Sequence, residues 1–270
     1  MSDSSDPYAA ESLTYSRYLR LDELLAIQNP RSDGPEHDEM LFIVIHQVYE
    51  LWFKQILHEL DHLKGLLEEL DTPRAQHTFK RILTILKVLV AQIDVLETMT
   101  PLEFLSFRDR LESGSGFQSF QFRELEFILG YKRWSTVKHY GEDEPARARL
   151  ERRYRERAVW DSFLRYLAGA GHPVPEEELN RDVTQAVAPS PALQAVLVET
   201  YRNDPVVRSV CERLVDLDEG LQEWRYRHVK MVERTIGKRQ GTGGSAGAEY
   251  LAKTLFQPLF PDLWEIRTEL

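Results

Sequence analysis

The sequence predicts an all-α fold built from long antiparallel helices, with a smaller helical insertion. Apolar residues recur at steps of three and four over long stretches, strand-like alternation is nearly absent, and the breaks carry helix start and stop signals. The chain has 270 residues, of which 42% are hydrophobic and 29% charged, so it is long enough to bury a core and too apolar to be disordered. We expect a single domain over residues 13–270 and a mobile N-terminus over residues 1–12.

Net charge and cysteine content limit the partners and the cellular compartment that we expect for this protein. The net charge is -10, and the 34 basic residues are scattered among 44 acidic ones, so we expect no nucleic-acid partner. The lone cysteine, Cys211, excludes an internal disulfide and fits a reducing compartment. The N-terminus lacks the marks of a signal peptide, and no apolar run approaches the roughly 20 residues that a membrane helix needs. We expect a soluble, cytoplasmic protein with no membrane partner.

The first two long helices are predicted over residues 38–70 and 73–99. Each repeats apolar residues on one face, and the break at residues 71–73 ends in a proline. A third helix is predicted to begin at a capping box, with Thr100 as the N-cap and Glu103 reaching back to it. We expect these helices to pack against one another.

The remaining elements follow two further breaks. A Gly/Ser segment at residues 113–116 interrupts the third helix, after which a helical pattern resumes over residues 117–129. Residues 131–190 contain shorter helical stretches, at 146–156 and 160–167, and are interpreted as a peripheral insertion. A long helix is then predicted over residues 205–236, and a segment with four glycines in ten residues follows it.

Two histidines have unusual surroundings. His46 shares a predicted helix face with Phe42, and burial there would lower its pKa and keep it neutral. A core histidine bonded to a backbone carbonyl is the alternative, and the commoner case. His228 shares a face with Trp224 and Met231, where a large apolar partner such as haem can bind with an axial imidazole. Taken alone, either histidine is a weak signal.

Two further features are compatible with ligand binding. Arg108 lies near Phe104 and Phe107, and its guanidinium needs an anion, which is either a ligand carboxylate or an internal Asp or Glu. The glycine-rich segment around Thr242 lets the backbone approach a ligand closely, or is a flexible connector. Residues 58–62 (HELDH) match a zinc-protease pattern, but no clear third ligand follows, so we do not expect a zinc site.

Taken together, the segments resemble the tryptophan 2,3-dioxygenase family from residue 13 to residue 270. Five ordered motifs carry the resemblance: LTYSRYLRL at 13–21, HDEMLFIVIHQ at 37–47, FRD at 107–109 with SGFQS at 115–119, WRYRH at 224–228, and GTGGS at 241–245. The order and spacing of all five make the resemblance far more specific than any one motif.

The resemblance implies a homotetrameric helical bundle that binds ferrous haem b and opens the indole ring of L-tryptophan with O2. His228 would be the proximal iron ligand, and Ser115 and Gly116 would also contact the haem. His46 would be the catalytic residue on the distal side, facing the indole N–H. The expected product is N-formyl-L-kynurenine.

The same resemblance implies a substrate site. Phe42 and Phe104 would enclose the indole, Arg108 would bind the carboxylate, and Thr242 would bind the ammonium and carboxylate end. A neighbouring subunit would contribute part of its N-terminal segment. The remaining implied substrate-binding residues are Tyr15, Tyr18 and Leu19 in that segment and Ile43, Val44 and Ile45 beside His46.

Two departures from the family pattern keep other functions open. Phe104 stands where many relatives have tyrosine, and Ala246 replaces a common serine. A haem monooxygenase acting on a substituted tryptophan is therefore one alternative. A non-catalytic haem-binding or helical interaction protein is another, supported only by the acidic, amphipathic composition.

Overall fold

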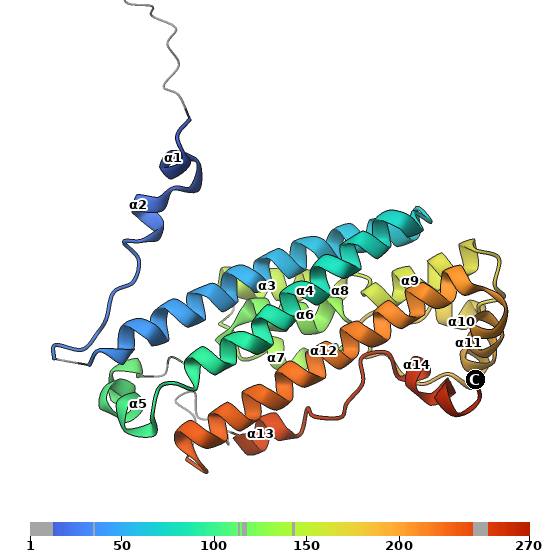
Figure 1. Cartoon of the computed structure of the whole chain (residues 1–270). Coiled ribbons are helices and arrows are strands. Elements are labelled where there is room, and N and C mark those ends of the chain that lie inside the picture. The colour runs from blue at the N-terminus through green and yellow to red at the C-terminus, as the bar shows by residue number, and fades with distance from the viewer. Residues whose placement is uncertain (1–12, 35, 113, 115–117, 142–143, 240–247) are drawn as a thin grey trace, which may run out of the picture.

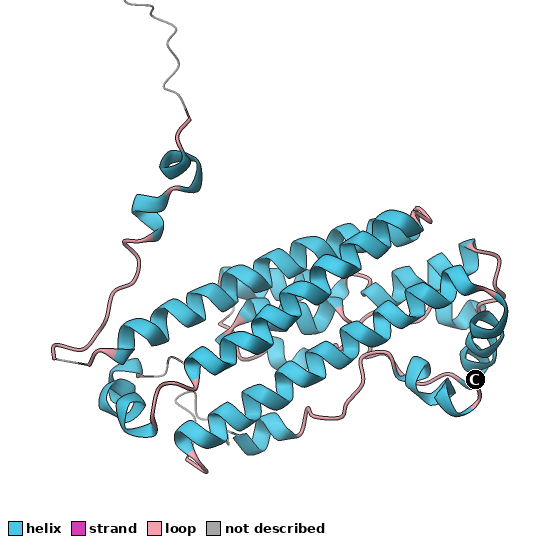
Figure 2. Ribbon diagram, in the orientation of Figure 1, coloured by secondary structure: helices cyan, strands magenta, loops and turns pink. Residues whose placement is uncertain are grey.

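The structure is a computed structural model that describes residues 13–34, 36–112, 114, 118–141, 144–239 and 248–270. Helices and loops make up these residues, which contain no strand (Figures 1 and 2). The all-α prediction is therefore confirmed. The expectation for residues 1–12 falls outside the described residues. None of the described helices has the length and apolar character that crossing a membrane requires.

Three long helices form the front layer of the molecule (Figure 1). They are α3 (Asp38–Glu68), α4 (Thr72–Leu96) and α12 (Pro205–Ile236), and α4 packs against both of the others. Gly220 permits a close approach of α12 to α4, since a Cβ there would meet Leu86 Cδ1 at 3.3 Å. The two closest-packed pairs thus fix where α3 and α12 lie relative to each other.

Shorter helices cover this layer and its ends. Two of them pack directly on α3, namely α6 (Phe120–Ile128) and α9 (Val159–Gly169), and α8 (Pro145–Arg155) packs on α6. The shorter elements are α1 (Tyr15–Leu19), α2 (Leu21–Leu24), α5 (Pro101–Phe107), η1 (Arg108–Leu111), α6 (Phe120–Ile128), α7 (Trp134–Val137), α8 (Pro145–Arg155), α9 (Val159–Gly169), α10 (Glu176–Leu179), α11 (Pro191–Asn203), α13 (Ala248–Ala252), α14 (Pro261–Glu265) and η3 (Ile266–Thr268).

Local chemistry sets the ends of the long helices. Asp71 caps α4 by accepting from Arg74 N, and Asp204 caps α12 by accepting from Val206 N and Val207 N. Leu70 has φ of +59°, which ends α3 before the residue that the sequence predicted as its last. These caps replace hydrogen bonds that a helix end lacks.

The prediction that residues 131–190 form a peripheral insertion is wrong for α9. Trp160, Phe163 and Leu164 are at most 1% exposed and belong to the central core. They pack on α3, because the amphipathic face of α9 needs an apolar partner and α3 provides one. A second, smaller core lies under α6, α7 and α8, where Phe127 and Leu150 are fully buried.

Candidate active site

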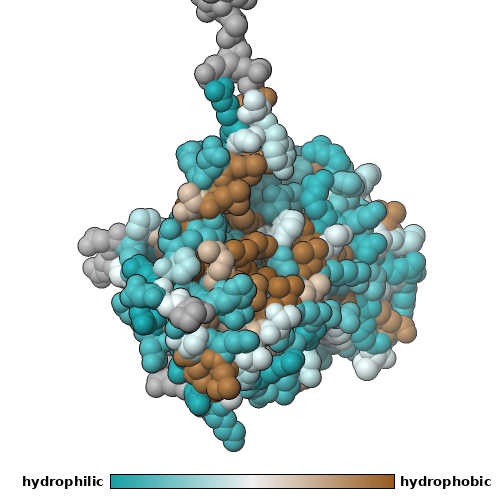
Figure 3. Space-filling model, turned by 60° about the vertical axis from the view of Figure 1, so that its left-hand side comes forward, coloured by the Kyte–Doolittle hydropathy of each residue, from teal (hydrophilic) through white to brown (hydrophobic). Residues whose placement is uncertain are grey.

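A cavity opens between α3 and α12, at the end of the molecule where α5 lies. Its volume is about 240 Å³, more than ten times the space that one water needs. Apolar side chains gather around a hollow in the face shown in Figure 3. Among the described residues, its lining includes Phe42, His46, Tyr49, Phe104, Arg108, Arg123, Glu126, Trp224, Arg225 and His228.

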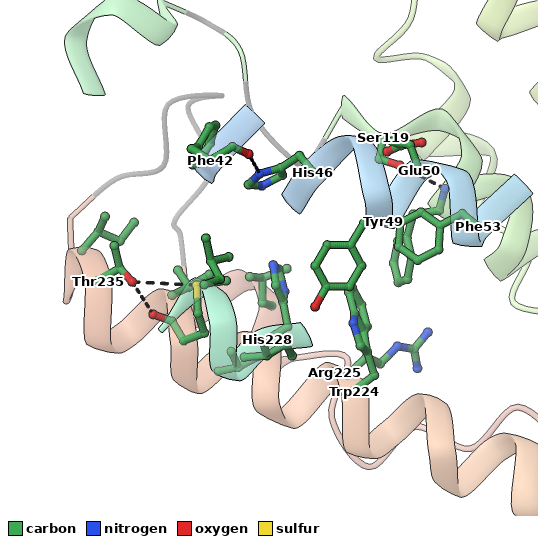
Figure 4. A pocket seen from close by; sticks show the side chains of 18 of the residues that line it. Phe42, His46, Tyr49, Glu50, Phe53, Ser119, Trp224, Arg225, His228 and Thr235 are labelled. Carbon is green, nitrogen blue, oxygen red and sulfur yellow. Dashed lines mark hydrogen bonds between the residues drawn. The ribbon is translucent and has the colours of Figure 1, made fainter. Parts of the chain in front are cut away.

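His46 and His228 face each other across this cavity. His46 comes from α3 and His228 from α12, and Figure 4 shows open space between their rings. Burial lowers the pKa of His46, although the Phe42 carbonyl and Glu50 act in the opposite direction. Burial, and then the proximity of His46 and Arg123, lower the pKa of His228 to about 4. Both imidazoles are therefore neutral at pH 7.

Each imidazole is held by its own helix. His46 Nδ1 lies 2.7 Å from the carbonyl oxygen of Phe42, one turn earlier on α3. The ring of His228 stacks on that of Trp224, one turn earlier on α12, with centroids 5.1 Å apart and planes 5° from parallel. Tyr49 packs edge-on against Trp224 and donates from its hydroxyl to Leu89 O at 2.8 Å. These contacts restrict both rings to fixed orientations.

Aromatic rings form the wall beside His46. Phe42 lies 4.1 Å from the His46 ring, 5.8 Å from Phe104 and 5.6 Å from Phe107, between ring centroids. Phe104 and Phe107 meet edge to face on α5. Arg108 follows them directly and is half-buried at the cavity lining. The cavity lining thus combines an aromatic wall with a guanidinium group.

A buried charged cluster lies at the inner end of the cavity, and the sequence did not predict it. Glu126 accepts from Arg123 and Arg133 at 2.8 Å each and from Arg225 at 3.3 Å. Burial raises the pKa of Glu126, but the three guanidinium groups outweigh this and hold the pKa below its ordinary value. Arg123 and Glu126 stand three residues apart on α6. This spacing can be seen in the sequence and allows an ion pair, but it does not show that the pair is buried.

The structure brings together only part of the predicted site. Within the described residues, Ile43, Val44 and Ile45 do not line the cavity, since Val44 is 40% exposed and Ile45 points into the core. The helical period turns these three side chains away from the face of His46. The predictions for Ser115, Gly116 and Thr242 fall outside the described residues.

The N-terminal residues of the prediction lie elsewhere. Tyr15, Tyr18 and Leu19 belong to α1 and are 74%, 72% and 41% exposed, on a segment that leaves the body of the molecule (Figure 1). They do not line the cavity of their own chain.

The zinc-protease pattern on α3 has a structural role instead. Its central carboxylate, Glu59, is buried and accepts from Arg81 and Gln55. The flanking His58 and His62 are exposed. A general base for metal-assisted hydrolysis would have to face the metal, and Glu59 faces Arg81.

Comparison with known proteins settles the family. A model of the family described as tryptophan 2,3-dioxygenase matches residues 2–167 and 189–270. The chain belongs to the tryptophan 2,3-dioxygenase family. The tryptophan 2,3-dioxygenase of Herpetosiphon aurantiacus is 63% identical over 97% of this chain and 100% of its own length. Those of Anaeromyxobacter dehalogenans and Caulobacter vibrioides are 56% and 46% identical, over 98% and 97% of this chain and all of theirs.

Membership of the tryptophan 2,3-dioxygenase family makes the chain an oxidoreductase. The family match extends over α3, α5 and α12, which carry both histidines, the aromatic wall and Arg108. It omits residues 168–188, within the segment that the sequence marked as an insertion, and these include α10. The cavity therefore lies wholly in the part that the family shares.

Proposed function

We propose that this enzyme opens the indole C2–C3 bond of L-tryptophan with O2 to give N-formyl-L-kynurenine, using ferrous haem b. The observation that supports this most is the pair of neutral imidazoles, from α3 and α12, on one apolar cavity. Family membership supplies the reaction type. The lone buried Cys211 suits a reducing cytoplasm.

The cavity has the chemistry that haem requires. A neutral imidazole is the form that ligates iron, and His228 presents one among apolar side chains. Trp224 stacks on that ring and limits its rotation. Haem bound there would supply the activation of dioxygen. Apolar neighbours such as Met231 would pack against its flat body and exclude water.

His46 would orient the indole. A carbonyl oxygen only accepts hydrogen bonds, so the contact with Phe42 O assigns the proton of neutral His46 to Nδ1. The lone pair of Nε2 is then available to accept the indole N–H. His46 thus positions the ring with the proton already on its far nitrogen, and it need not remove a proton to do so.

The rest of the substrate would contact charged and aromatic groups. Phe42 and Phe104 would pack on the indole, and Arg108 would bind the carboxylate with two parallel N–H···O bonds. We assign Thr242 to the ammonium and carboxylate end, and Ser115 and Gly116 to the haem. Together these contacts would hold the C2–C3 bond in place for reaction.

The enzyme is proposed to act as a homotetramer with exchanged N-terminal segments. Tyr15, Tyr18 and Leu19 are exposed apolar side chains on a segment with no buried residue of its own. In the proposed assembly they would complete the cavity of a neighbouring subunit. The exposed area of these side chains would then be removed from water.

The proposed reaction is tested with purified ferrous protein, L-tryptophan and 18O2. We expect a Soret band that shifts on adding tryptophan, and a formylkynurenine product carrying two labelled oxygens. One labelled atom would instead identify the monooxygenase alternative, for which the absence of a hydroxyl on Phe104 is the relevant observation. A Soret band with neither spectral shift nor product would identify a non-catalytic haem protein.

The two histidine roles are tested separately. His228→Ala should lose haem, read as loss of the Soret band, because the iron loses its protein ligand. His46→Ala should keep the Soret band and lose only part of the turnover, because it orients substrate. A His228→Ala protein with unchanged haem content and turnover would contradict the assignment.

A further inference from the structure

The N-terminal arm, residues 13–27, joins the body through the linker, residues 28–34. The arm extends away from the three long helices in Figure 1. Its helices α1 and α2 have no buried residue, and Tyr15 and Tyr18 are more than 70% exposed. Because the arm buries none of its helical residues against the body, its direction depends on how the linker is held.

Glu39 binds the linker to the first turn of α3. Its carboxylate accepts from two successive backbone groups, Arg31 N at 2.6 Å and Ser32 N at 3.0 Å. The Glu39 side chain is buried, with the residue only 1% exposed. Burial raises the pKa of Glu39, but the hydrogen bonds to the linker hold it below its ordinary value. Glu39 therefore binds the linker as a carboxylate, and each of its oxygens accepts a hydrogen bond from one N–H group.

A second attachment lies further along the same helix. Gln28 Nε2 donates to Gln47 Oε1 at 2.6 Å, and Gln47 Nε2 donates to Ile27 O at 3.3 Å. Glu39 and Gln47 are about 12 Å apart along α3, given the rise per residue of an α-helix. The linker thus runs antiparallel to the start of α3, with one attachment at each end. Two separated attachments fix a direction, which one alone does not.

We propose that Glu39 is a positioning residue that aims the arm, so that Tyr15 and Tyr18 enter the cavity mouth of a second copy of this chain. This inference rests on the exchange of N-terminal segments proposed above. Apolar side chains surround the hollow in Figure 3. The arm exposes large side chains that can bury area against such a surface, namely Leu13, Tyr15, Tyr18, Leu19, Leu24, Leu25 and Ile27. Holding the arm in one direction raises its effective concentration at the neighbour's cavity.

The first test uses Glu39→Gln, which keeps the shape and replaces one accepting oxygen with an NH2 group that donates and cannot accept. We expect the haem content to be unchanged and the KM for tryptophan to rise about ten-fold or more. Trypsin should cut the variant faster after Arg20 and Arg31, because the arm and linker are released. Asp38→Asn removes the same charge from the same helix turn and should leave KM and cleavage at their wild-type values.

The second test asks whether the arm acts at the cavity of its own chain or at the cavity of a second copy. Glu39→Gln chains are co-expressed with His228→Ala chains under two affinity tags, and oligomers with both tags are isolated. The haem sites then lie on chains with misdirected arms, while the intact arms lie on chains without haem. With random pairing, about half of the haem sites receive an intact arm, so turnover per haem at low tryptophan should recover to about half of wild type.

The control for this test replaces the His228→Ala partner with a chain carrying both substitutions, which supplies no well-directed arm. Recovery should then disappear. Turnover equal to that of the Glu39→Gln homo-oligomer in both mixtures would overturn the proposal, as would unchanged trypsin cleavage in Glu39→Gln. If the wild-type protein makes no formylkynurenine, the proposed function fails, whereas the trypsin comparison still decides whether Glu39 holds the linker.

Discussion

Three arginines converge on the carboxylate of Glu126 beside the cavity. Arg123, Arg133 and Arg225 come from different segments, and all three contact a side chain that is 1% exposed. Buried charges are tolerated only when opposite charge and hydrogen bonds compensate them, so Glu126 offsets a repulsion that would otherwise separate α6 from α12. The carboxylate therefore joins two elements that line the cavity.

Replacing Glu126 should strongly reduce stability. We expect Glu126→Gln to lower the free energy of unfolding by about 3 to 5 kcal/mol at pH 7, because it leaves buried guanidinium groups without a counter-charge. Urea unfolding measures this loss. Glu151→Gln is the control, since Glu151 pairs with Arg147 nearer the surface, and we expect a loss of at most about 1 kcal/mol there.

The stabilising effect of Glu126 has a defined pH dependence. The pKa of Glu126 is lower in the folded protein than its ordinary value of about 4.3. Its stabilising effect is therefore present above that value and is lost as pH falls through the folded pKa, when the unfolded chain binds more protons. The difference between wild type and Glu126→Gln should shrink below about pH 4. A difference that stays constant from pH 7 to pH 3 would show that charge is not the cause.

Substrate binding should depend on Arg108 and not on its neighbour Arg110. Arg108→Leu should weaken tryptophan binding by about 2 to 4 kcal/mol, through loss of a bidentate charged contact. Arg110 is exposed, and its 3.8 Å ion pair with the exposed Asp33 of the linker adds little to the hydrogen bonds of Glu39 and Gln47, so Arg110→Leu should leave the KM nearly unchanged. Equal KM values for wild type and Arg108→Leu would remove Arg108 from the site.

At the residue scale, the sequence was enough to select His46 and His228 as candidate site residues. It did not reveal their hydrogen bonds or their surroundings in the fold. Aromatic neighbours at helical spacing made both histidines stand out, and the structure puts both on one cavity. The protonated nitrogen of His46 depends on a carbonyl contact that no pattern of letters reveals. The burial of Glu126 likewise depends on Arg133 and Arg225, which only the fold brings to it.

Among the elements, α12 carries the largest share of the site. It bears His228, Trp224 and Arg225, and it also holds the C-terminal segment through Asp218. The Asp218 carboxylate is fully buried and accepts from Leu259 N, Phe260 N and Trp264 Nε1, in addition to Gln222 on its own helix. One side chain thereby fixes where α14 begins.

Substituting Asp218 should release that segment. Asp218→Ala leaves several buried N–H donors without an acceptor, so we expect a loss of about 3 kcal/mol or more in the free energy of unfolding. Hydrogen exchange at Leu259 and Phe260 should become faster. Asp216→Asn provides the control, because Asp216 is 43% exposed and pairs with Arg213 on the same helix. Protected amides at 259 and 260 in the alanine variant would refute this role.

Element boundaries were predictable where capping signals were strong. The predicted bounds of α12 match the structure, since proline follows Asp204 at its start and Gly237, with φ of +61°, ends it. The helix after the Gly/Ser segment begins at Phe120, three residues later than predicted, because Ser119 caps it. Helix α11 was not predicted. Helix α9 was predicted within its observed bounds, but its place in the core was not, because burial depends on which helices become neighbours.

For the molecule as a whole, the arm and the body are separate energetic units. Removing residues 1–27 takes away α1 and α2, which contribute no buried residue. We expect the helical body to keep its haem and its unfolding transition, while the KM for tryptophan rises and the oligomer dissociates at higher concentration. Gel filtration and urea unfolding together test this. A large fall in stability of the dissociated subunit would show that the arm supports its own chain.

The two imidazoles stand on helices from opposite ends of the sequence, α3 starting at residue 38 and α12 at residue 205. During synthesis His46 leaves the ribosome long before His228 exists. A chain stalled before α12 has only one wall of the cavity and lacks the histidine proposed as the iron ligand. If haem binds there as proposed, its loading must wait until translation is nearly finished, and haem capture would report that α3 and α12 have come together.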